Sequence, residues 1–203
     1  MDTLLLYDTA CPPALRIKVE SALAATGAVV VSAELDIRRI RPCVGCFKCW
    51  VKTPGACYIT RDGVNELSAR FTDMPRIVLL TQVLWGSYSA DSKAFIDRCI
   101  QHLLPFFSIR HREMHHVPRY RHYPDWVVIG YQARSPEEQE TFRQLIQRNA
   151  INFFADKATG LCLEGVTFDE ESLAHFAQIL QEGNNETVGD RQRQPEKNEQ
   201  RVE

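Results

Sequence analysis

Short apolar runs alternate with segments of helical periodicity along most of the chain, and this alternation constrains the fold more than any other feature. The runs predict five strands, at Thr3–Tyr7, Val29–Ser32, Arg76–Thr81, Trp126–Tyr131 and Leu161–Val166. Strands separated by helices join through right-handed crossovers into a parallel sheet, which helices cover on both faces. We therefore predict an α/β fold with a doubly wound five-stranded parallel sheet in the order 2-1-3-4-5.

The intervening segments predict helices with the usual start and stop residues, such as Pro13 at the start of the first and Gly27 beyond its end. The expected helices are Pro13–Thr26, a short one near Gly63–Phe71, Ala90–Leu104, Ser135 to about Phe154, and Asp169–Gln181. Beyond Gly183 the chain is almost entirely polar. We expect one domain over residues 1–182, followed by a disordered polar tail over residues 183–203.

The charge balance and the N-terminus exclude several classes of protein. With a net charge of −2, the chain has no overall basic character that would indicate nucleic-acid binding. Asp2 stands where a signal peptide needs a basic residue, and the apolar run Leu4–Tyr7 is too short to cross a membrane. We expect a cytoplasmic protein that does not bind membranes, in a compartment where thiols stay reduced.

Four of the seven cysteines lie close together with the spacing C-x2-C-x2-C-x7-C: Cys43, Cys46, Cys49 and Cys57. Two residues between thiols let a tight loop direct three sulfurs at one iron–sulfur cubane, and Pro54-Gly55 lets the chain return with the fourth. Zinc sites more often use separate cysteine pairs, and a reducing compartment disfavours disulfides. The spacing leaves two interpretations open: a cluster, or free thiols that merely pack in the loop.

The segment after the third strand, TQVLWGSYSADSKAFIDR (residues 81–98), resembles the flavin-contacting loop of the NAD(P)H-dependent FMN reductases and multimeric flavodoxins. Gln82 departs from that family, which usually has proline there. The resemblance implies FMN as cofactor, NAD(P)H as electron donor, and flavin contacts from Gln82, Val83, Leu84, Trp85, Gly86 and Ser87. Because the cofactor does the chemistry, no catalytic side chain is assigned. A plain connection from strand to helix, with Asp97 and Arg98 as an ion pair, is the simpler alternative.

The cysteine segment RPCVGCFKCWVKTPGACYITRDG (residues 41–63) is similar to the cluster loop of the iron–sulfur flavoproteins. This resemblance implies a flavodoxin-like fold that holds a [4Fe–4S] cluster on the four cysteines, next to FMN. It also implies a small-molecule electron acceptor or a redox protein as partner, and assembly as a homodimer or homotetramer. Arg61-Asp62 stands where the family often has two acids, and we expect this difference to affect only the following helix cap.

The loop after the first strand, YDTACPPALRIK (residues 7–18), does not match the loops that hold the FMN phosphate. Such loops are rich in hydroxyl groups and backbone N–H donors. Here Thr9 offers one hydroxyl, Asp8 is unfavourable to an anion, and Pro12 and Pro13 lack N–H groups. If FMN binds, Thr9, a few backbone amides and Arg16 would hold its phosphate. Because these segments follow strand ends at one edge of the sheet, FMN would lie between residues 9–13, residues 82–88 and the turn after Gly130. The alternative is a flavin-free module of the same fold that binds metal through thiolates or senses through thiols.

An insertion rich in arginine and histidine lies before the fourth strand, LLPFFSIRHREMHHVPRYRHYPDW (residues 103–126). No spacing of its histidines matches a known metal site. We expect a solvated basic loop, whose arginines would be available for the phosphates of NAD(P)H or for an acidic substrate. Pro105-Phe106-Phe107 is expected to act as a hydrophobic anchor, either within the subunit or against a partner subunit.

Overall fold

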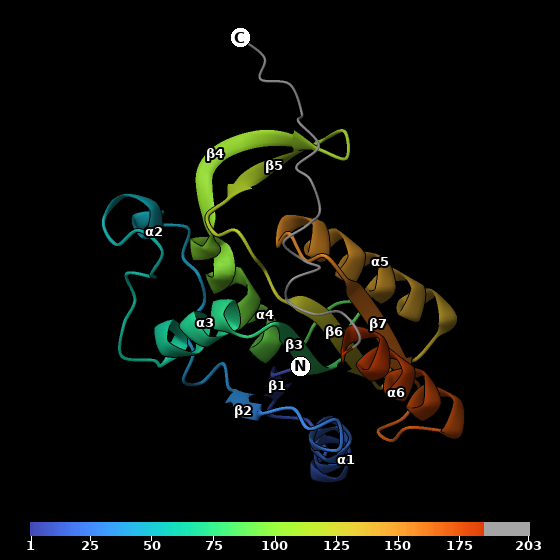
Figure 1. Ribbon diagram of the computed structural model, residues 1–203. Coiled ribbons are helices and arrows are strands. Elements are labelled where there is room, and N and C mark those ends of the chain that lie inside the picture. Colours follow the sequence, from blue (N-terminus) through green and yellow to red (C-terminus); the bar gives the residue numbers. More distant parts are fainter. Residues whose placement is uncertain (185–203) are drawn as a thin grey trace.

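A five-stranded parallel sheet forms the centre of the computed structural model, which describes residues 1–184 (Figure 1). Its strand order is β2-β1-β3-β6-β7, which is the predicted order 2-1-3-4-5 when only the strands of this sheet are counted. The flavodoxin-like α/β fold is thus confirmed. The strands are β1 (Thr3–Asp8), β2 (Val30–Leu35), β3 (Arg76–Gln82), β6 (Asp125–Tyr131) and β7 (Ala158–Leu163).

Helices cover both faces of the sheet, each over its own apolar core (Figure 1). On one face lie α1 (Pro13–Ala24) and α6 (Glu170–Asn184), and on the other lie α3 (Val64–Asp73), α4 (Ala90–Arg98) and α5 (Pro136–Asn152). Successive strand residues such as Leu4 and Leu5 enter opposite cores, because side chains alternate across a strand. None of the described helices is long and apolar enough to cross a membrane.

Several predicted boundaries differ from the structure by a few residues, and three of these differences affect how elements connect. The fifth strand starts at Ala158 rather than Leu161, because pairing with β6 extends through the only partly buried residues 158–160. The helix from Ala90 ends at Arg98 and continues as a 3-10 turn, η1 (Cys99–His102). The last helix extends to Asn184, past the boundary placed at residue 182, and the rest of the predicted tail lies outside the described residues.

The insertion is not a solvated loop, so that prediction was wrong. It forms an antiparallel hairpin of β4 (Leu103–Arg110) and β5 (Glu113–Pro118), which projects from the end of the sheet beyond η1 (Figure 1). His111 and Arg112 at its tip both have positive φ, as a two-residue type I′ turn requires. Cross-strand hydrogen bonding gave this segment a structure that its basic composition did not indicate.

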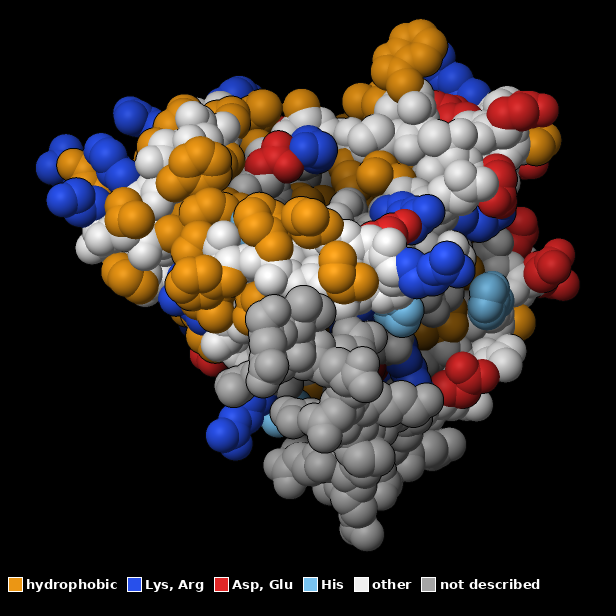
Figure 2. Space-filling view, turned by 90° about the horizontal axis from the view of Figure 1, so that it is seen from above, with side chains coloured by type: hydrophobic (Ala, Val, Ile, Leu, Met, Phe, Trp, Pro, Cys, Tyr) orange, Lys and Arg blue, Asp and Glu red, His pale blue; other side chains and the backbone are white. Residues whose placement is uncertain are grey.

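Two of the arginines in this segment contact the chain itself. The Arg110 guanidinium lies 4.4 Å from the centre of the Phe154 ring, and Arg119 Nε donates to the carbonyl of Gln101 at 3.0 Å. Phe106 and Phe107 are largely exposed, at 66% and 61%, although the Phe107 ring stacks on His116 of β5 with 4.5 Å between ring centres. Seen from the hairpin side, hydrophobic side chains gather over part of this surface (Figure 2).

His102 is the buried side chain through which pH should act on this fold. Its ring stacks on Phe71 and its Nε2 lies 2.7 Å from Ser68 Oγ. Burial, and secondarily the charge of Arg119, lowers its pKa to about 4. The unfolded chain therefore takes up a proton near pH 6.5 that the folded chain resists until about pH 4. The contribution of neutral His102 to the free energy of unfolding is therefore fully present above pH 6.5, and it is lost as the pH falls from 6.5 towards 4.

We predict that the free energy of unfolding drops by about 3 kcal/mol between pH 7 and pH 4 through this group alone. Urea denaturation across that range measures the drop, and His102→Gln should flatten the curve. His122→Gln, at an exposed position, is the control and should follow the wild-type curve. Equal pH dependence in wild type and His102→Gln would contradict the assignment.

Candidate functional site

The cysteine segment forms a loop with one short helix, α2 (Lys48–Val51), between β2 and α3. Gly45 and Gly55 both have positive φ, which places glycine where the chain turns sharply. Gly55 N–H donates to the carbonyl of Cys49 at 3.2 Å. This hydrogen bond holds the second half of the loop beside α2. A cavity of about 310 Å³ results, and it is lined by all four cysteines: Cys43, Cys46, Cys49 and Cys57.

The four thiols differ in burial but influence one another electrostatically. Cys49 and Cys57 are buried, Cys43 is half-buried and Cys46 is exposed, and none of them forms a disulfide. Burial raises the pKa of Cys49, and charge on Cys57, Cys43 and Cys46 raises it further. A thiolate at Cys49 is therefore opposed both by burial and by negative charge on its neighbours.

The cysteines surround the cavity instead of converging on one point. Residues 1–184 contain no group of three or more His, Cys, Asp or Glu side chains placed to hold a metal ion. A zinc ion with four thiolate ligands needs Zn–S distances of about 2.3 Å, which sets the sulfurs roughly 3.8 Å apart. The loop in this conformation does not provide that arrangement.

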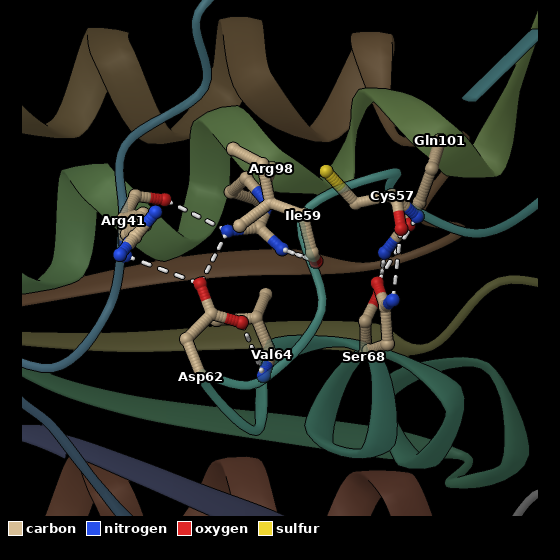
Figure 3. A network of polar contacts seen from close by, with 9 residues as sticks. Arg41, Cys57, Ile59, Asp62, Val64, Ser68, Arg98 and Gln101 are labelled. Carbon is tan, nitrogen blue, oxygen red and sulfur yellow. Dashed lines mark hydrogen bonds and ion pairs between the residues drawn. The ribbon is translucent and has the colours of Figure 1, made fainter. Parts of the chain in front are cut away.

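Arg98, at the end of α4, ties the two ends of the cysteine loop together (Figure 3). Its Nη1 donates to the carbonyl of Arg41 at 2.8 Å, just before the first cysteine, and its Nη2 donates to the carbonyl of Ile59 at 2.9 Å, just after the last. The same guanidinium forms an ion pair with Asp62 at 2.7 Å. The Arg98 side chain is fully buried, and it also lines the cysteine cavity.

Asp62 therefore does more than influence the following helix, and the expectation that its effect ends at the cap was wrong. Burial on its own would raise the pKa of Asp62, but hydrogen bonds from Arg98 and from the backbone of Arg41 and Val64 lower it. The alternative pairing of Asp97 with Arg98 is not formed, because Asp97 instead pairs with Lys93 one turn earlier on α4. Adjacent residues on a helix point in different directions, so Asp97 and Arg98 face different surroundings.

The loop after β3, predicted to contact a flavin ring, is a tight turn that presents Trp85 to solvent. Leu84 and Ser87 exchange two backbone hydrogen bonds of 3.0 and 2.9 Å, and Trp85 and Gly86 between them both have positive φ. This is a type I′ turn, in which a bulky residue at the first central position is strained. Trp85 is 93% exposed.

A cavity of about 440 Å³ lies beside this turn, between it and the start of α5. Val83, Leu84 and Trp85 form its wall on the β3 side. From α5, Glu138 accepts hydrogen bonds from the backbone N–H of Gly86 at 3.2 Å and of Arg134 at 2.7 Å. The structure thus brings part of the predicted ring-contacting loop into one concave surface with an exposed aromatic side chain.

The loop after β1 does not offer the donors that an FMN phosphate needs. Thr9 N–H and Thr9 Oγ1 both donate to Asp91 Oδ2, at 3.0 and 2.6 Å. The buried Asp8 carboxylate next to them accepts from Gln82 N–H at 2.7 Å and from Tyr131 Oη at 2.5 Å. Two carboxylates lie where the phosphate would have to bind, so the residues present do not fit FMN at its phosphate end.

Sequence reasoning missed Asp91 and Glu138 as members of this edge. Both lie in the first turn of a helix, where acidic side chains are common and carry no distinctive signal. Their hydrogen bonds link segments far apart in the chain, such as Thr9 and Asp91. Only the packing of the strands identifies these partners.

Comparisons with known proteins support the fold. No family model and no curated protein matches the chain. Solved structures do match, among them an NAD(P)H:quinone oxidoreductase from Methanothermobacter marburgensis, with a TM-score of 0.60 and 13% identity over 91% of this chain and 96% of that one. A putative quinone reductase from Klebsiella pneumoniae has a TM-score of 0.58 and 14% identity, over 90% and 83% of the two chains.

A flavodoxin belongs to the same set of similar structures. Oxidised Flavodoxin 1 from Bacillus cereus matches with a TM-score of 0.54 and 10% identity, over 92% of this chain and 99% of that one. At such low identity the likeness concerns the backbone, so it establishes the architecture independently of any motif. The chain has the flavodoxin-like fold.

We predict that Arg98→Met destabilises the protein by about 3–5 kcal/mol, because it leaves the Asp62 carboxylate buried without its partner. Chemical denaturation measures this cost. The double variant Arg98→Met, Asp62→Leu should recover part of the loss, since it removes the unpaired charge but not the loss of hydrogen bonds to the backbone of Arg41, Ile59 and Val64. Lys93→Met on the same helix breaks an exposed pair and is the control, with an expected cost below about 1 kcal/mol. A cost below about 1 kcal/mol for Arg98→Met as well would contradict the prediction.

Proposed function

We propose that this chain is an oxidoreductase or electron-transfer protein of the flavodoxin-like fold, with a [4Fe–4S] cluster bound by Cys43, Cys46, Cys49 and Cys57. One observation carries the proposal: all four cysteines of the C-x2-C-x2-C-x7-C segment line a single cavity of about 310 Å³. Thiols spread around a cavity suit a polynuclear cubane better than a single zinc ion, whose ligands must converge.

The residues around the cavity hold the loop in shape. The lining contains one acid, Asp97, and one base, Arg98, whose charge is paired with Asp62. The hydrogen bonds of the buried Arg98 guanidinium to Arg41 and Ile59 keep the two ends of the loop at a set separation. Cys57 is held further through Asn65, which donates to its carbonyl at 2.9 Å and accepts from its N–H at 3.0 Å. When bound, the cluster supplies one-electron transfer, and the exposed Cys46 marks the side open to a redox partner.

A flavin and a nicotinamide donor are supported by the turn at Trp85 and by similar structures, and not by the cysteine cavity. The turn with Trp85 and its neighbouring cavity offer a place for a planar ring, and two of the similar structures have quinone reductase activity in their names. The phosphate end of FMN does not fit, however, so we assign no step to FMN. Electrons would come from NAD(P)H and leave to a small-molecule acceptor or a redox protein.

A flavin-free module that binds metal through thiolates is the second candidate. It is favoured by the occupied donors of the strand-end loops, where Asp8 and Asp91 accept the bonds that a phosphate would need. Flavin titration separates the two candidates, because the module binds the cluster but no flavin ring.

The hairpin favours self-association, and we propose a homodimer or homotetramer. Phe107 and Ile109 lie two residues apart on β4, and Ile109 pairs with Met114 of β5, so these three exposed side chains share one face of the hairpin. Phe106, next to Phe107 in the chain, is also exposed. A hydrophobic patch of this kind marks an interaction surface more often than a monomer's free surface.

For the cluster, we predict that wild-type protein reconstituted without oxygen binds about four irons per chain and gives the Mössbauer and EPR spectra of a [4Fe–4S] centre. Cys46→Ser should lose most of the bound iron and these spectra while keeping its circular dichroism. Cys162→Ser, which alters a half-buried thiol outside the loop, is the matched control and should bind iron like wild type. Wild-type protein that forms no cluster would show that the loop holds only free thiols.

For assembly, we predict that wild-type protein elutes as a dimer or tetramer of its 23.3 kDa chain, measured by light scattering after size-exclusion chromatography. Phe106→Ser combined with Phe107→Ser should shift the mass to one chain, because it removes apolar area from the hairpin surface. Val29→Ser, at an exposed apolar residue on the opposite part of the fold, should leave the mass unchanged. A monomeric wild type would refute the assignment.

A further inference from the structure

The place at which this fold would receive a phosphate already contains an anion that belongs to the chain. The Asp91 carboxylate, from the first turn of α4, reaches the loops that follow β1 and β2. Its Oδ2 accepts from Thr9 N–H and Thr9 Oγ1, and its Oδ1 accepts from Ile37 N–H at 2.8 Å. One carboxylate thus satisfies three donors from two loops, with Asp91 only 8% exposed.

The surroundings of Asp91 exclude a second anion. Asp8, next to Thr9, is 1% exposed and accepts two hydrogen bonds of its own. Pro12 and Pro13, at the start of α1, remove two N–H groups that could otherwise donate to a phosphate. Arg16 of α1 pairs with Glu20 at 3.3 Å, and Arg38, which the field of Asp91 reaches, pairs with Asp36 at 2.9 Å. A phosphate here would meet two carboxylates and few donors.

We propose that Asp91 takes the place of a ligand phosphate, so that this edge of the sheet selects against phosphorylated flavins and accepts planar rings without a phosphate. A carboxylate that bridges two loops performs the same structural task as a bound phosphate, since both neutralise converging donors. The protein keeps its loops together without a ligand. The surface formed by Val83, Leu84 and Trp85, where a planar ring would bind, then has no phosphate site next to it.

This inference concerns the loops after β1, β2 and β3 and does not depend on a cluster at the cysteine loop. It does deepen the flavin part of the proposed function, because it names the class of ring that the edge accepts. A failure of iron reconstitution would leave it untouched, and a phosphate site in the wild type would overturn it without bearing on the cluster.

The first test uses inorganic phosphate as the probe and thermal unfolding as the measurement. In Asp91→Ala the three donors lose their acceptor, so phosphate should bind and raise the melting temperature above that in chloride at equal ionic strength. Wild type should show no phosphate-specific shift. Asp73→Ala, which removes an exposed acid at the end of α3, controls for the change in net charge and should behave like wild type. Equal shifts in wild type and Asp91→Ala, or no shift in either, would overturn the proposal.

The second test compares FMN with riboflavin by fluorescence titration, since the two differ only in the phosphate. Wild type should bind riboflavin at least as tightly as FMN, and Asp91→Ala should prefer FMN by about tenfold or more. Wild type that binds neither flavin would overturn the proposal, because the edge would then accept no ring. Asp91→Asn keeps the size of the side chain and one oxygen acceptor, so its preference for FMN should lie between those of wild type and Asp91→Ala. A wild-type preference for FMN of about tenfold would show that the phosphate is bound despite Asp91.

Discussion

Parallel pairing of β1 between β2 and β3 is the constraint on which the rest of this structure depends. It sends the loops after these three strands out at the same edge of the sheet, where ligands of open α/β sheets bind. Backbone N–H groups at such an edge need acceptors, because a buried donor without one costs stability. This chain supplies the acceptors itself, through Asp8, Asp91 and Glu138.

The cysteine loop is held by a different device, the buried pair of Arg98 and Asp62. A buried ion pair adds little net stability over an apolar replacement, but losing one partner is costly. Its evident contribution is geometric, because the guanidinium also binds the carbonyl groups of Arg41 and Ile59 at either end of the loop. A loop closed in this way keeps its thiols around one cavity.

The hairpin supports the same loop from the other side. Trp50 of α2 donates from Nε1 to the carbonyl of Leu103 at 2.9 Å, at the first residue of β4. The Trp50 ring also lies 5.0 Å from Phe47 and 5.0 Å from His116 of β5, measured between ring centres. The insertion thus helps to hold the cysteine loop, and the Phe107 ring extends the same stack, 4.5 Å from His116 between ring centres. The cysteine cavity and an apolar surface are neighbours in this molecule.

The sequence by itself determined the architecture and grouped four cysteines in one loop. Alternating apolar runs and helical periods predict the order of the sheet, because burial on both faces requires them, and Cys43, Cys46, Cys49 and Cys57 predict a shared loop through their spacing alone. The sequence did not predict the hairpin of β4 and β5, because the basic composition of this segment indicated a loop. The hydrogen bonds between the two strands determine its structure instead.

Only the tertiary structure decided which side chains meet at the edge. Asp91 lies 82 residues from Thr9, and Asp62 lies 36 residues from Arg98. Neither pairing leaves a periodic signal, because an acidic residue in the first turn of a helix or before a helix looks the same whether it faces solvent or a distant loop. The sheet brings these residues together through contacts between distant segments. The packing alone therefore determined that a carboxylate, that of Asp91, accepts the hydrogen bonds of the loops after β1 and β2.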